Sequence, residues 1–136
     1  MTKKVKKEFK FSKIPPNSKI KNMRAISIRQ PYAEAIMSGQ KKMEYRSTLT
    51  HVRGTVLIYA GLAKESDEAF ENFKVDKNKV PKGLIIGKVD IVDCVWVKKY
   101  KLFGYVLKNP KRFKKLLKSK NQPQPRWFFP FVSLKK

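Results

Sequence analysis

The alternation of apolar and polar residues is clearest between residues 27 and 46, where it predicts a strand, a helix, a turn and a second strand. Pro31 suits the first position of a helix, because its missing N–H would have no partner there. The apolar residues that follow at helical spacing are Tyr32, Ala33, Ile36 and Met37. Gly39, just past that stripe, is the type of residue that caps a helix in the left-handed conformation. We therefore expect a tight turn over residues 40–42 and a strand over residues 43–47.

The strand after this turn is predicted to bring three ionisable side chains together. Glu44 and Arg46 are two residues apart, so in a strand they point to the same face. Lys41 lies in the turn that leads into the strand. We predict that these three side chains converge at the mouth of the turn. The alternative is a solvated Glu44–Arg46 ion pair, which would contribute little to stability.

The other apolar runs predict further strands and one more helix. Residues rich in β-formers occur at 24–29, 52–60, 83–97, 103–107 and 126–132. Gly61 should end the second of these strands, and Gly87 marks a bulge or a close backbone approach in the third. Residues 64–75 predict a helix, with Asp67 and Glu68 in its first turn, where acidic groups suit the helix dipole.

Two stretches of the second half of the chain leave alternatives open. The odd-numbered positions of residues 83–97 form an apolar face with Asp93 set into it, so Asp93 is expected to be structural or to line a pocket. Asn109–Pro110 has the residue types that cap and start a helix, which would be short, basic and amphipathic. A loop or an extended segment is the alternative there.

The composition indicates one domain with a large excess of positive charge. The chain has 136 residues, of which 41% are hydrophobic, enough to bury a single core. Its 33 Lys and Arg against 10 Asp and Glu give a net charge of +23. The excess is concentrated in residues 1–22 (+7) and 107–136 (+10). We therefore expect a polyanionic partner, a single domain over residues 23–136, and a basic extension over residues 1–22 that is either disordered or partly packed.

The counts of cysteine and histidine bear on the chemistry of the protein. One cysteine, Cys94, permits no internal disulfide, and its apolar surroundings predict a core position. Together with the single histidine, His51, it makes no zinc constellation, so we expect neither metal nor cofactor. No apolar run approaches the ~18 residues of a membrane span, and no apolar segment follows the N-terminal lysines. We expect an intracellular protein, cytoplasmic or, in a eukaryote, nuclear.

The motif Gly39-x-Lys41-x-x-Glu44-x-Arg46, preceded by residues 27–31, resembles the signature of the ASCH domain, the activating signal cointegrator homology family. Further features of that family follow in order, namely Arg53-Gly54, residues 83–94, residues 103–110 and Trp127. The resemblance covers about residues 23–130. It implies an α+β fold, a PUA-like small mixed β-barrel of about five or six strands with two main helices, and a polar cleft between the barrel and the first helix.

The same resemblance, with the charge, leads us to expect nucleic-acid binding, with RNA favoured over DNA. The residues predicted to bind are Lys41, Glu44, Arg46, Ser27, Arg29, Gln30 and Arg53. Lys41 or Arg46 would meet an anion, while Glu44 would accept from a base edge or orient the cations. Trp127 is predicted to be either a core residue or a platform on which a base stacks.

Two other functions stay open. Some members of the family resemble metal-independent amidohydrolases that act on acetylated cytidine, and a ribonuclease activity is a further alternative. The amidohydrolase machinery implied is a lysine, a threonine three residues later and a glutamate on a later strand. Here the candidates are Lys41, with Glu44 in place of the threonine, and Asp90 or Asp93 as the later acid. The last alternative is a basic partner-binding subunit of a ribonucleoprotein or transcription complex.

Overall fold

The computed structural model of the chain describes residues 11–12 and 20–133. The elements are β1 (Phe11–Ser12), a 3-10 turn (Ile20–Asn22), β2 (Ala25–Gln30), α1 (Tyr32–Ser38), β3 (Met43–Arg46), β4 (Gly54–Lys64), α2 (Asp67–Phe73), β5 (Leu84–Val97), β6 (Leu102–Leu117) and β7 (Trp127–Phe128). Most of the predicted basic extension, residues 1–22, lies outside the described residues. No helix within the described residues is long and apolar enough to cross a membrane.

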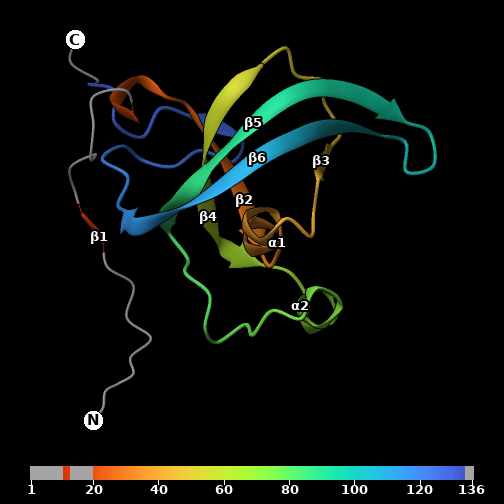
Figure 1. Ribbon diagram of the computed structural model, residues 1–136, viewed down its shortest axis with the longest axis horizontal. Coiled ribbons are helices and arrows are strands. Elements are labelled where there is room, and N and C mark those ends of the chain that lie inside the picture. Colours follow the sequence, from red (N-terminus) through yellow and green to blue (C-terminus); the bar gives the residue numbers. More distant parts are fainter. Residues whose placement is uncertain (1–10, 13–19, 134–136) are drawn as a thin grey trace.

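The strands form one curled, half-barrel sheet in the order β1-β6-β5-β4-β2-β7, with β3 paired to β6. Figure 1 shows the long β5–β6 hairpin curving across the molecule, with α1 beside it and α2 set apart from the sheet. Because β1 and β7 are only two residues long, the strands β2 to β6 make up most of the barrel. The predicted α+β fold is therefore confirmed.

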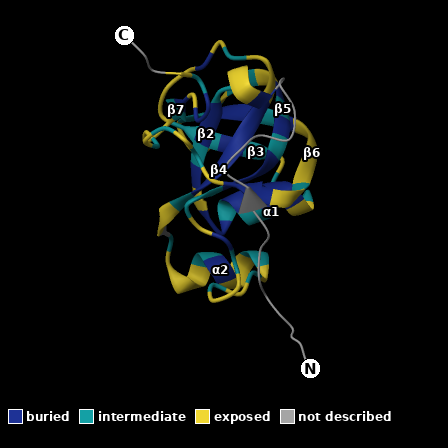
Figure 2. Ribbon diagram, turned by 90° about the vertical axis from the view of Figure 1, so that its left-hand side faces the viewer, coloured by how far each residue is buried: buried dark blue, intermediate teal, exposed yellow. Residues whose placement is uncertain are grey.

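Two apolar clusters hold the sheet together, one on each face. The larger lies on the face covered by α1, where Ile36 and Met37 of the helix pack against Ile58 and Ile86 of the sheet. The smaller lies on the other face and contains Leu57, Ile85 and Phe128 among others. Figure 2 shows the buried residues gathered in the sheet and α1, while α2 is largely exposed. Because β4 is buried on both faces of the sheet, residues 52–60 form a nearly continuous apolar run.

Both helices are capped by residue types that commonly cap helices. Gly39 has a φ of 86° and its N–H donates to the carbonyl of Ile36, which is the left-handed cap expected. Ser66 caps α2 by accepting from the N–H of Ala69, so this helix begins at Asp67 rather than at 64. The prediction that Gly61 ends its strand is wrong, because β4 continues to Lys64.

The helix considered at Asn109–Pro110 does not form, because β6 runs from Leu102 to Leu117 as one strand paired with β5. Between the pairs Lys88–Lys111 and Asp90–Lys108, β6 carries one residue more than β5. Asn109 takes up this bulge with a left-handed φ of 56°. Backbone pairing along β5 thus overrides the local helix signals, and the proline sits where a bulge tolerates it.

Gly87 is the close-approach point that its place in the strand predicts. A Cβ built there would collide with the carbonyl oxygen of Lys111 and the sulfur of Met37. The register between β5 and β6 also shifts on both sides of this residue. Only glycine therefore fits between α1 and β6 at this point of the sheet.

The expectations for Asp93 and Cys94 need correction. The Asp93 side chain is 59% exposed and lies 3.8 Å from an Arg53 nitrogen, so it is neither a core group nor a pocket wall. Its carboxylate accepts from the N–H of Cys94. Cys94 is only partly buried and packs against the edge of the larger core cluster. The irregular register between Ile91 and Asp93 shifts the parity of the strand, so the apolar face does not continue to this end.

The last predicted strand is much shorter than residues 126–132. Only Trp127–Phe128 pairs with β2, and the chain then leaves the sheet. Asn121 donates to the carbonyls of Phe129 and Val132, which holds this terminal segment in an irregular conformation. Phe128 and Phe131 are buried, whereas Phe129 is 41% exposed, so the rings do not share one side.

Candidate functional site

The structure brings Lys41, Glu44 and Arg46 into one cluster. The Nε of Arg46 donates to Glu44 Oε2 at 2.8 Å, and the Nζ of Lys41 lies 3.6 Å from Glu44 Oε1. A terminal nitrogen of Arg46 donates to the carbonyl of Ser27, which ties β3 to β2. Gly39 makes this geometry, because its left-handed turn directs the chain from α1 back along β6 as β3.

This cluster is buried rather than solvated. Only 8% of the Glu44 side chain is exposed, against 12% for Lys41 and 20% for Arg46. Burial lowers the pKa of Lys41 below the ordinary lysine value, the charge of Glu44 opposes that shift, and the charge of Arg46 adds to it. The Oε1 atom of Glu44 accepts no hydrogen bond among the described residues, although the ammonium of Lys41 is near. The two cations thus compensate a carboxylate that would be costly to bury alone.

A cleft of about 690 Å³ opens beside this cluster. Its walls come from β2, the start of α1, β3, the end of β4, and a loop near the C-terminus. The residues that line it include Ser27, Arg29, Tyr32, Glu44, Tyr45, Arg46, Glu65, Gln122 and Gln124. The cleft therefore combines tyrosine rings, guanidinium groups and amides, which are the groups that contact bases and phosphates in nucleic acids.

Of the other predicted residues, Ser27 and Arg29 reach the cleft. The Ser27 hydroxyl donates to the carbonyl of Gln124 at 2.6 Å, which fixes the C-terminal loop over β2. Arg29 is 59% exposed and its guanidinium pairs with Glu65 at 3.2 Å. Arg29 is thus the more accessible of the two arginines in the lining.

Gln30, Arg53 and Trp127 do not line the cleft. Gln30 is fully buried, and its amide accepts from the N–H of Glu34 and donates to the carbonyl of Pro81, which are structural roles. Arg53 donates to the carbonyls of the connection before β4. Trp127 is paired with Ile26 in the sheet and packs against the larger core cluster.

A family model described as the ASCH domain matches residues 26–128, which is most of the chain. The chain belongs to the ASCH domain family. Activating signal cointegrator 1 from Homo sapiens is 30% identical to it over 87 residues, which cover 56% of this chain and 15% of that protein. The ASCH domain described here thus corresponds to a small part of that relative.

Solved structures of a bacterial protein have the same fold. The crystal structures of two point mutants of ZmASCH from Zymomonas mobilis superpose with a TM-score of 0.56 each. They share 15% and 14% sequence identity with this chain, covering 80% and 79% of it and 88% and 89% of the bacterial chains. At this identity the likeness concerns the fold alone.

Sequence reasoning missed several residues of the cleft of this ASCH domain. Tyr32 belongs to the apolar stripe predicted for α1, but in the structure it lines the cleft, and its ring packs edge-on against Phe73. Tyr45 also lines it, and Glu65 enters through the extension of β4 beyond Gly61. The loop over residues 122–125 carried no signal, since its position depends on contacts with β2 that are far away in the sequence.

The acids considered for a hydrolase do not join the cluster. The Asp90 carboxylate accepts from the amide of Asn109 and from the hydroxyl of Thr55, and these bonds lower its pKa. Asp93 is exposed at the far part of the hairpin, and neither residue lines the cleft. The acid that accompanies Glu44 in the lining is instead Glu65.

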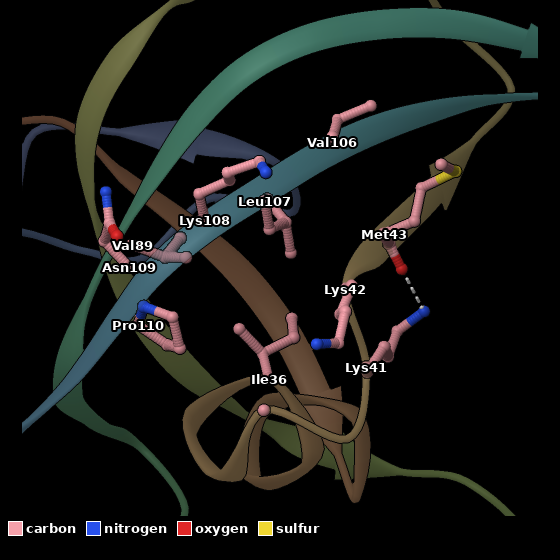
Figure 3. Close-up of a pocket in the computed structure, with 11 residues that line it drawn as sticks. Ile36, Lys41, Lys42, Met43, Val89, Val106, Leu107, Lys108, Asn109 and Pro110 are labelled. Carbon is pink, nitrogen blue, oxygen red and sulfur yellow. Dashed lines mark hydrogen bonds between the residues drawn. The ribbon is translucent and has the colours of Figure 1, made fainter.

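A second hollow, of about 370 Å³, lies on the other side of the segment that joins α1 to β3. Figure 3 shows Ile36, Val89 and Leu107 in it, with the Lys42 side chain reaching toward Ile36. The Lys41 side chain turns away, and its Nζ donates to the carbonyl of Met43 at 2.7 Å. Lys41 is among the residues that line this hollow. Because Glu44 and Arg46 line the other one, we take the larger cleft as the candidate site.

Proposed function

We propose that this ASCH domain binds single-stranded nucleic acid, RNA in the first place, with one nucleotide in the cleft and neighbouring phosphates on its basic surface. The observation that carries the proposal is the lining of the cleft, to which the partly exposed residues Tyr32 and Tyr45 contribute together with Arg29 and Arg46. Aromatic rings stack on bases of any sequence, and guanidinium groups pair with phosphates in a fixed geometry.

Within this proposal Glu44 orients the cations rather than accepting from a base. Its Oε2 holds the Nε of Arg46, and its Oε1 atom is inaccessible to solvent. Arg46 is further fixed by the carbonyl of Ser27. A guanidinium anchored at these points loses little conformational entropy when a phosphate arrives, which favours binding.

The charge along the chain supports a polyanionic ligand. No Asp or Glu follows Asp93 in the sequence. The exposed lysines on the β5–β6 hairpin are Lys98, Lys99, Lys101, Lys108, Lys111, Lys114 and Lys115. In contrast, α2 begins with Asp67 and Glu68 and is an unsuitable face for a polyanion. The preference for RNA over DNA rests on the family resemblance.

Fluorescence anisotropy with a labelled ten-nucleotide single-stranded RNA, the matching DNA and an RNA duplex tests this proposal. If about six phosphates are neutralised, the slope of log affinity against log salt should be about −4 on the single strands. Arg29→Gln should weaken binding by about fivefold or more, because a charge-assisted contact in the cleft is lost. Lys82→Gln removes the same charge from an exposed position outside the cleft and should change affinity less than twofold. Equal effects of both variants, or binding that is insensitive to salt, would refute a cleft-based nucleic-acid site.

An amidohydrolase is the second candidate, favoured by the lowered pKa of Lys41. Against it, Lys41 does not line the cleft and its Nζ is engaged by a backbone carbonyl. Incubation with acetylated cytidine followed by chromatography separates the two functions. Deacetylated product from the wild type and none from Lys41→Ala would establish an amidohydrolase that depends on Lys41. No product from the wild type would leave nucleic-acid binding as the function.

A further inference from the structure

A row of rings and ammonium groups leads out of the cleft to the tip of the β5–β6 hairpin. The Nζ of Lys41 lies 5.3 Å from the ring centroid of Tyr32 and 4.8 Å from that of Tyr45. The Tyr45 ring meets that of Tyr100 edge-on, with centroids 5.1 Å apart. At the outer end the Nζ of Lys99 lies 5.4 Å from the Tyr100 centroid.

The register of β3 on β6 explains why this row forms. Tyr45 is paired with Gly104, near the start of β6, which places it next to the β5–β6 turn. The space over Gly104 itself is filled by the side chains of Met43 and Val97. In the turn after β5, the N–H groups of Tyr100 and Lys101 donate to the carbonyl of Val97. Lys101 adopts a left-handed φ of 56°, which reverses the chain. The turn therefore places the Tyr100 ring against the Tyr45 ring, although the two residues are far apart in the sequence.

The outer end of the row is open to solvent and strongly basic. Tyr100 is 50% exposed, and the adjacent Lys98, Lys99 and Lys101 are all exposed. One exposed ring is ordinary on a protein surface. A ring that touches a cleft tyrosine on one side and is surrounded by lysines on the other has the composition of a single-strand binding surface.

We propose that the β5–β6 turn, residues 98–101, is an outer site for the nucleotides that flank the one held in the cleft. Tyr100 stacks on a base there, and the lysines of the turn contact the phosphates on either side. The inference rests on the proposed function, because the cleft fixes where the strand starts. The contact between Tyr45 and Tyr100 is direct, so the two rings serve neighbouring nucleotides along one strand.

The hairpin provides a matched control at Trp96, which is 55% exposed. Trp96 is paired with Phe103, whereas Tyr45 is paired with Gly104, the next residue of β6. Side chains of successive residues point to opposite faces of a sheet, so Trp96 and Tyr45 lie on opposite faces. Trp96 shares its face with Arg46, which is also paired with Phe103, but it does not line the cleft. Substituting Trp96 therefore removes an exposed ring of the same hairpin without touching the row that contains Tyr100.

The experiment compares a single ribonucleoside monophosphate, which can fill only the cleft, with a ten-nucleotide single-stranded RNA, each titrated by calorimetry into the full chain. Tyr100→Ala should weaken binding of the ten-nucleotide RNA by about fivefold or more, the effect of losing one stacked base, and change binding of the mononucleotide less than twofold. Tyr100→Phe keeps the ring and should retain the affinity within twofold. Trp96→Ala should leave both affinities unchanged, and Lys99→Gln should reduce the salt dependence for the longer RNA only.

The outcomes separate this inference from the proposed function. Unchanged affinity of Tyr100→Ala for the ten-nucleotide RNA, with the mononucleotide still bound, overturns the outer site and leaves the cleft site intact. Failure of the wild type to bind either the mononucleotide or the ten-nucleotide RNA overturns both. Equal losses for Trp96→Ala and Tyr100→Ala overturn the outer site as well, because they indicate unspecific apolar contact. The outer site is also overturned if Tyr100→Ala weakens binding of polyglutamate as much as binding of the ten-nucleotide RNA, because that result indicates an acidic protein as the partner.

Discussion

Replacing Arg46 with methionine tests whether the buried ion cluster supports the barrel. The substitution keeps an apolar stem of similar length but removes the 2.8 Å contact to Glu44 and the bond to the carbonyl of Ser27. Glu44, 8% exposed, then keeps only Lys41, whose Nζ is 3.6 Å away. The variant therefore leaves the buried Glu44 carboxylate with one neighbouring cation instead of two, and it removes the hydrogen bond that ties β3 to β2.

The size of the effect follows from burial. Removing one partner of a buried ion pair typically costs about 3–5 kcal/mol, whereas exposed pairs contribute about 0–1 kcal/mol. Since Lys41 remains and Arg46 is 20% exposed, we expect Arg46→Met to lower the free energy of unfolding by about 2–4 kcal/mol. Arg53→Met is the control. Its side chain is 42% exposed, lies 3.8 Å from Asp93 and donates to the carbonyls of Thr50 and Val52. Because water can replace these partners at that exposure, its loss should cost at most about 1 kcal/mol.

Urea denaturation at pH 7, followed by circular dichroism, measures both variants. With the usual dependence on urea for a small domain, the midpoint for Arg46→Met should fall by about 1–2 M. Combining it with Glu44→Gln should give less than the sum of the single effects, with a coupling of about 1–3 kcal/mol. If Arg46→Met costs no more than Arg53→Met, or if the effects of Arg46→Met and Glu44→Gln simply add, the cluster is not a coupled buried network.

Two further predictions concern the cluster and the sheet. The pKa of Lys41, followed by NMR of its side-chain methylene signals, should lie below the ordinary value of about 10.4. It should be lower still in Glu44→Gln, because that variant removes the attraction of a negative charge. It should be higher in Arg46→Met, because that variant removes the repulsion of a positive charge. Identical titration of all three proteins would contradict these contacts. Gly87→Ala should destabilise the fold by about 1–3 kcal/mol in the same urea assay, because the new methyl group meets the backbone of β6. Gly104→Ala should cost less, because the atoms it meets belong to side chains that can move, and the reverse order would refute this reading of the close approach.

Much of the site was predictable because it lies within twenty residues and depends on local rules. The left-handed cap at Gly39 and the two-residue period of a strand place Lys41, Glu44 and Arg46 together with no knowledge of the rest of the chain. The same period separates Arg29 from Gln30 in β2. Gln30 is fully buried whereas the Arg29 side chain is 59% exposed, as this alternation predicts.

The sequence by itself determined the α+β class, the capped helix and the order of polar groups in the motif, because each depends on neighbours a few residues apart. Only the tertiary structure decided that Trp127 joins the core through its pairing with Ile26, that Asn109–Pro110 becomes a bulge instead of a helix, and that Tyr100 reaches Tyr45. These outcomes depend on which strands pair and in what register. Such long-range pairing, through backbone hydrogen bonds and burial of both sheet faces, outweighs the small local preferences that a sequence pattern reports.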